Sequence, residues 1–102
     1  MSSIKIYNNE NVDSGKVVLQ FSADWCNPCK VVKGIIQELI EGFPDVEFYY
    51  IDCDLPENSG IATRFAVRSI PNLVFLKDGN EVASTVGSVP KEKIKECLDE
   101  LK

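Results

Sequence analysis

The sequence contains no histidine at all and is short of positive charge. Without imidazole groups, serine–histidine triads, cysteine–histidine dyads and histidine-ligated metal sites are excluded. Eleven lysines and arginines stand against 16 aspartates and glutamates, which gives a net charge of −5. This balance argues against a nucleic-acid partner, because binding to phosphates needs clustered positive charge.

Long apolar runs are missing as well. No stretch approaches the roughly 20 apolar residues that a membrane-spanning helix needs, and residues 1–10 lack the apolar core of a secretory signal. We therefore expect a soluble, cytoplasmic protein with no membrane partner. We also expect it to be a monomer. With 102 residues, 44% of them hydrophobic, the chain has material for one hydrophobic core. Residues 1–102 are predicted to form a single domain.

The hydrophobic pattern predicts an α/β fold, a mixed sheet with helices on both faces. Nearly continuous apolar runs are typical of strands buried on both sides, whereas apolar residues three or four apart indicate helices. The expected strands cover residues 4–7, 16–21, 46–51, 73–76 and 81–86, the last two joined by a turn at Asp78-Gly79. The expected helices run from the first cysteines to about residue 40, through part of residues 56–65, and onward from residue 90. Gly42 and Pro44 are expected to stop the first helix.

Two of the four cysteines, Cys26 and Cys29, stand at CxxC spacing where the first long helix is expected to begin. At that spacing two thiols can be close enough to form a disulfide. The free N–H groups and the positive end of a helix lower the pKa of a thiol below its ordinary value of about 8.5. Cys26 is then the expected nucleophile, and Cys29, one turn inside, resolves the mixed disulfide. Pro28 suits the first helical turn, where its missing N–H is not needed.

Other uses of this spacing stay open at this point. Zinc and iron–sulfur sites also employ CxxC, but they need further ligands, and Cys53 and Cys97 are isolated in the sequence. A lone structural disulfide is a second alternative. We expect Cys53 and Cys97 to be small buried apolar residues, with regulatory oxidation as the alternative.

Three elements of the sequence, in order, resemble the thioredoxin family over nearly the whole chain. Trp25-Cys26-Asn27-Pro28-Cys29 is similar to the family's WCGPC motif, Ile70-Pro71 to its isoleucine and cis-proline, and Gly87 to a glycine lining the same groove. The resemblance implies a thioredoxin fold and a protein-disulfide reductase with no bound cofactor or metal, whose working group is a Cys26–Cys29 disulfide. It implies a thioredoxin reductase and disulfide-containing proteins as partners. It also implies a substrate-docking rim made by Trp25, Asn27, Pro28, Ile70, Pro71 and Gly87.

The sequence departs from the family at several positions. Asn27 replaces the usual glycine between the cysteines, and Gln20 and Tyr50 stand where a buried aspartate and its lysine are usual. The proton relay assigned to that aspartate therefore cannot be carried over. With Gln20 neutral and no other titrating partner evident beside it, Cys26 is expected to ionise in one simple transition. Residues 8–15 are too short and polar for the family's full first helix.

Two competing functions are open to a CxxC protein of this kind. A disulfide oxidase or isomerase would use the same cysteines in an oxidising compartment, and the N-terminus carries no sign of export. A non-redox interaction subunit could use the fold alone, but such a subunit has no need for both Cys26 and Cys29.

Overall fold

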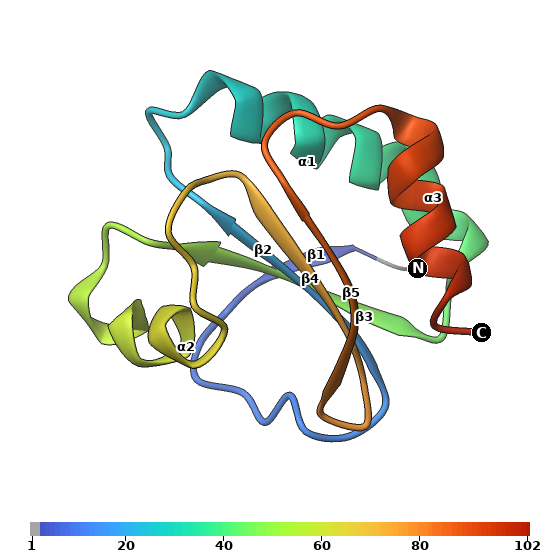
Figure 1. Cartoon of the computed structure of the whole chain (residues 1–102), viewed down its shortest axis with the longest axis horizontal. Helices are drawn as coiled ribbons and strands as arrows, with labels where there is room; N and C mark the ends of the chain where they lie inside the picture. The colour runs from blue at the N-terminus through green and yellow to red at the C-terminus, as the bar shows by residue number, and fades with distance from the viewer. Residues whose placement is uncertain (1–2) are drawn as a thin grey trace.

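The computed structural model describes residues 3–102, and a five-stranded mixed sheet lies at its centre (Figure 1). The strands are β1 (Ile4–Ile6), β2 (Lys16–Ser22), β3 (Val46–Asp52), β4 (Asn72–Lys77) and β5 (Asn80–Val86), arranged in the order β1-β3-β2-β4-β5. The β1–β3 and β2–β3 pairs are parallel, and the β2–β4 and β4–β5 pairs are antiparallel. The strand expectations are confirmed to within a residue or two at each end.

Helices cover both faces of this sheet (Figure 1). Helices α1 (Asn27–Leu39) and α3 (Lys91–Asp99) lie on one face and α2 (Ser59–Arg64) on the other, with short 3-10 turns η1 (Ile40–Gly42) and η2 (Pro56–Asn58). The expected α/β class is confirmed. The short helix expected within residues 56–65 is present as η2 followed directly by α2.

Strand β2 is buried on both faces because its side chains alternate between two apolar layers. Val18 packs with Val32 and Ile36 of α1, whereas Leu19 and Phe21 pack on the side of α2. Leu19 and Phe21 are fully buried. Burying a side chain of this size contributes about 1.5–3 kcal/mol. Because β2 is fixed from both sides, the loop that follows it starts from a rigid position.

Two features near the edges of the fold bear on the sequence expectations. The described chain between β1 and β2 contains no helix, as its polar composition predicts, and Val12 from this segment is buried in the core on the α2 side. Helix α1 ends at Leu39 and passes into η1, so Gly42 ends the helical segment without adopting a left-handed conformation. The helical segment ends at the expected residue, but it ends through the 3-10 turn η1 rather than through a left-handed glycine.

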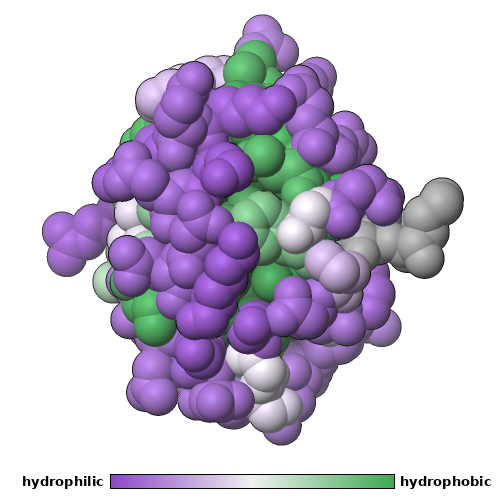
Figure 2. All heavy atoms as spheres, turned by 90° about the vertical axis from the view of Figure 1, so that its right-hand side faces the viewer, coloured by the Kyte–Doolittle hydropathy of each residue, from purple (hydrophilic) through white to green (hydrophobic). Residues whose placement is uncertain are grey.

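The surface is mostly hydrophilic. On the face that forms the right-hand side of Figure 1, apolar surface is concentrated in a central strip between hydrophilic side chains (Figure 2). None of the helices in the described part of the chain has the length and apolar character needed to cross a membrane.

Candidate active site

The cysteine pair lies where β2 leads into α1. Cys26 is the N-cap of α1, and its Sγ accepts a hydrogen bond from the Cys29 N–H at 3.2 Å. Pro28 occupies the first helical turn, as its fixed φ favours. Cys26 and Cys29 are joined by a disulfide with their Cα atoms 5.3 Å apart, a usual separation for such a bond. A backbone N–H of the first turn, that of Cys29, therefore donates to the Sγ of Cys26, the predicted nucleophile.

The disulfide is nearly covered by its surroundings. Cys29 is 1% exposed and Cys26 4%, and both pack with Ala23 and the half-buried Ile70. The expectation that Cys29 lies deeper is confirmed, although the difference is small. Trp25, by contrast, is 69% exposed, and its Nε1 donates to Asp54 Oδ2 at 2.8 Å. Asn27 and the ring of Pro28 are also exposed, so the motif presents three side chains to solvent around a covered disulfide.

Three residues distant in the sequence lie beside the motif or beside one another. The Ile70–Pro71 peptide bond is cis, and Ile70 contacts the disulfide cluster. The Gly87 N–H donates to the Pro71 carbonyl at 2.7 Å, and Gly87 has φ +80°, a conformation that favours glycine. The loop before β4 and the end of β5 are thus connected directly, with Ile70 joining them to the cysteines.

A groove of about 390 Å³ adjoins Trp25 and Ile70. It is bordered by the residue after β3, by α2 and by the loop that leads to Pro71. The lining residues are Trp25, Cys53, Asp54, Ser59, Ala62, Thr63, Val67, Arg68, Ser69 and Ile70. Among these, Ile70 also packs against the disulfide.

Comparison with known proteins agrees with this geometry. A family profile described as Thioredoxin matches residues 3–100. The chain belongs to the thioredoxin family. Thioredoxins of Staphylococcus haemolyticus and Chlamydia pneumoniae are 37% and 43% identical to it, over 97% and 87% of this chain and 97% and 89% of their own. The crystal structure of Malassezia sympodialis thioredoxin (Mala s 13) superposes with a TM-score of 0.85 at 28% identity, covering 99% of this chain and 92% of that one.

Membership of the thioredoxin family defines the chemistry. The chain is a thiol–disulfide oxidoreductase, and its redox group is the cysteine pair rather than a bound cofactor. The family suggests a thioredoxin reductase and disulfide-containing proteins as partners. Among residues 3–102, no cluster of three or more histidine, cysteine, aspartate or glutamate side chains could hold a metal ion.

Position 20, where thioredoxins usually carry an acid, is directly behind the cysteines. Gln20 is 1% exposed, and its Nε2 donates to the Cys29 carbonyl at 3.1 Å. Its Oε1 has no hydrogen-bond partner in the described structure. Tyr50 lies opposite Gln20 in the β2–β3 register, which agrees with the correspondence expected from sequence. This thioredoxin therefore replaces an ionisable pair with a neutral amide and a phenol.

The structure brings near Cys29 a carboxylate that the sequence pattern does not reveal. A cavity of about 300 Å³ is lined by Asp24, Cys29, Lys30, Lys33 and Tyr50. Burial, together with the negative charges of Asp24 and Asp52, raises the pKa of Tyr50 to about 12. The only sequence signal for this arrangement is that Asp24 immediately precedes the motif. Which residues surround Asp24 is determined by the β2–β3 register and by the residue at which α1 starts.

The two remaining cysteines differ from each other. Cys97 is 4% exposed in the core with α1, as expected. Cys53 is only half-buried and borders the groove beside Trp25, so its burial is less complete than predicted. Burial raises the pKa of both thiols, which makes them poor nucleophiles at neutral pH.

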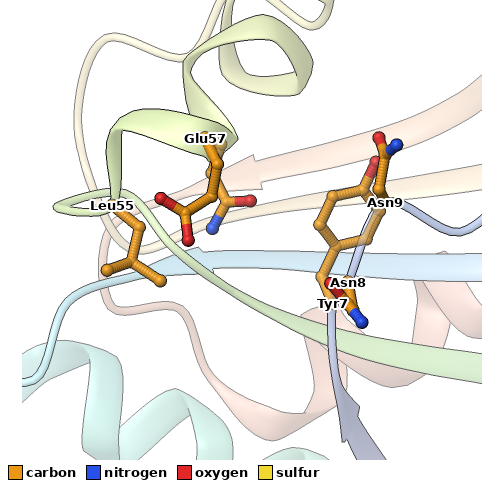
Figure 3. Close-up of a pocket in the computed structure, with 6 residues that line it drawn as sticks. Tyr7, Asn8, Asn9, Leu55 and Glu57 are labelled. Carbon is orange, nitrogen blue, oxygen red and sulfur yellow. The ribbon is translucent and has the colours of Figure 1, made fainter.

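A separate pocket, not lined by any cysteine, lies between the segment after β1 and the 3-10 turn η2 (Figure 3). Tyr7, Asn8 and Asn9 form one side, and Leu55, Glu57 and Asn58 form the other, around about 250 Å³. The lining residues offer amides, one phenol and one carboxylate, but no thiol.

Proposed function

We propose that this thioredoxin reduces protein disulfides, with Cys26 as the attacking and Cys29 as the resolving thiol. The observation that carries the proposal is the hydrogen bond from the Cys29 N–H to Cys26 Sγ at the start of α1. A backbone donor and the positive end of a helix both stabilise a thiolate. In the reduced protein the Cys26 thiolate attacks one sulfur of the target disulfide. Cys29 then attacks Cys26, closing the disulfide and releasing the target as a dithiol.

Substrate docking is the second part of the proposal. The exposed Trp25, the Ile70-Pro71 segment and Gly87 are proposed to form the rim on which an extended target segment lies, with Asn27 and Pro28 at its edge. Residues before β4 lie outside the sheet, and we propose that the main chain of Ile70 pairs with such a segment. The large exposed area of Trp25 supports this role, because tryptophans left at surfaces are enriched at binding hot spots.

We further propose that a thioredoxin reductase restores the dithiol, and that the protein works as a single-domain monomer in the cytoplasm. A reductase with easily oxidised thiols needs a reducing compartment to be recycled. The related thioredoxins of Staphylococcus haemolyticus and Chlamydia pneumoniae are of similar length to this chain, which supports a single domain.

The docking rim is tested by an insulin reduction assay with Trp25→Ala. We expect kcat/KM to fall about ten-fold, equivalent to about 1.4 kcal/mol, chiefly through a higher KM, because the indole contact with substrate is lost. Val82→Ala, which removes an exposed apolar side chain from β5, is the matched control and is expected to leave kcat/KM unchanged. Equal values for the two variants would show that substrates do not dock on Trp25.

A further inference from the structure

The resolving step requires a proton acceptor. Position 20, where thioredoxins usually carry an acid, does not provide one in this chain. Cys29 attacks only as a thiolate, so its thiol must lose a proton first. It is 1% exposed, which limits direct contact with solvent. Gln20 cannot take the proton, because an amide does not ionise and its Nε2 already donates to the Cys29 carbonyl. The acceptor must therefore come from another side chain or from water alone.

The cavity against Cys29 contains one carboxylate, and it belongs to Asp24. This residue lies in the loop between β2 and α1, is exposed at the side chain, and lines the cavity with Cys29. The Tyr50 hydroxyl donates to Asp24 Oδ1 at 3.4 Å, which holds the carboxylate toward the cavity. A space of about 300 Å³ has room for water to connect the carboxylate and the thiol.

The other groups that face this cavity are unsuited to accept the proton. Tyr50 is neutral at working pH because burial raises its pKa to about 12, and its hydroxyl acts as a donor. Lys30 and Lys33 line the cavity as ammonium groups, and Lys33 Nζ lies 4.9 Å from the centre of the Tyr50 ring. Their positive charge favours a thiolate over a thiol at Cys29. Asp52 acts on Tyr50 through its charge but does not line the cavity.

We propose that Asp24, oriented by the Tyr50 hydroxyl, accepts the proton of the resolving thiol through water in this cavity. The inference rests on the proposed reductase function. It assigns to Asp24 the proton-accepting role that an acid at position 20 would otherwise have. The Cys29 S–H gives its proton to the Asp24 carboxylate, and the resulting thiolate attacks Cys26 Sγ. The Cys26–target bond breaks, and the target leaves as a thiolate that takes up a proton from Asp24 or solvent. The dithiol is oxidised and the target disulfide is reduced.

The two steps can be separated by mixing the reduced protein with an excess of an aromatic disulfide whose thiol absorbs light. The first release of chromophore reports attack by Cys26 and depends on reagent concentration. The second, independent of concentration, reports resolution by Cys29. For Asp24→Asn we expect an unchanged first phase and a second phase slowed at least about ten-fold near pH 6.5. The second-phase rate should then rise by about ten-fold per pH unit, because only the spontaneously ionised thiol reacts.

Two further variants make the test selective. Glu57→Gln removes one negative charge at an exposed site away from the cysteines, and its second phase should match that of the unmodified protein. Asp24→Glu should recover most of the rate and remove the rise of about ten-fold per pH unit, because it restores a carboxylate. If the second-phase rates of Asp24→Asn and Glu57→Gln depended on pH in the same way, the role of Asp24 would be overturned, but the proposed function would stand. Absence of the second phase in the unmodified protein would overturn the proposed function itself.

Discussion

Cys29→Ser is expected to abolish turnover on insulin and to trap this thioredoxin in a mixed disulfide with its target. Cys26 keeps its place at the start of α1 in this variant, so the first attack still occurs. A serine hydroxyl in place of the buried Cys29 thiol cannot displace the target, because an alcohol ionises far less readily than a thiol and forms no disulfide. Non-reducing electrophoresis and mass measurement of the adduct should find one target attached through Cys26.

Two control variants complete this experiment. Cys26→Ser should show neither turnover nor adduct, because the nucleophile itself is missing. Cys97→Ala removes a thiol from the core beside α1 and should retain full turnover, with only a modest loss of stability. Accumulation of the adduct in Cys26→Ser, and not in Cys29→Ser, would mean that the two roles are reversed.

Gln20→Asp is expected to lower the free energy of unfolding by about 4 kcal/mol at neutral pH through ionisation alone. The side chain at position 20 is fully buried and faces Tyr50 rather than a lysine, so a carboxylate there has no cation on the neighbouring strand. Desolvation of this kind raises the pKa of a carboxyl by roughly 3 units or more, and each unit corresponds to about 1.4 kcal/mol. The amide that donates to the Cys29 carbonyl is lost as well.

The loss of stability in Gln20→Asp has a defined pH dependence. The folded-state pKa of the new acid lies above its value of about 4 in the unfolded chain, so both states are protonated below that pH and no ionisation penalty exists. As pH rises from about 4 to about 7 the unfolded chain ionises first, and stability falls steadily. Gln20→Asn introduces a side chain of the same shape as aspartate but without the charge. Its stability should therefore not fall between about pH 4 and about pH 7. Urea denaturation of both variants across this range measures the difference.

Parallel pH dependence for the aspartate and asparagine variants would show that the acid is readily solvated and that position 20 is not desolvated in solution. Thiolate absorbance provides a second readout for the same pair. Gln20→Asp should add a coupled transition at elevated pH beside that of Cys26, because interacting acids titrate together. Gln20→Asn should not.

Sequence alone could predict those elements whose burial leaves a continuous or periodic apolar pattern. Strand β2 is covered on both faces, so the run at residues 16–21 predicts it closely. The start of α1 is marked by the motif itself, because Cys26 is the cap and Pro28 suits the first turn. Helix α2 is only six residues long and follows a 3-10 turn, so its pattern is too short to give bounds.

The cysteine pair and the groove residues could be proposed from order and spacing, but the surroundings of Cys29 could not. Asp24 and Tyr50 are distant in sequence, and their hydrogen bond depends on the register of β3 against β2 and on the path of the loop into α1. Cys53 shows the same limit. Its position after β3 suggests burial, yet the bend toward η2 leaves it half-exposed beside the groove.

Cys26 and Cys29 form a reversible couple poised to reduce other proteins' disulfides. The midpoint potential of the full chain tests this claim most directly. Equilibrating the protein in dithiol–disulfide buffers and quantifying the alkylated cysteines gives the fraction oxidised at each potential. We expect one two-electron transition that requires both cysteines, with a midpoint below about −230 mV, more reducing than the glutaredoxin range. A midpoint above about −180 mV, where protein disulfide isomerase lies, would contradict the claim and place this thioredoxin among the oxidases and isomerases.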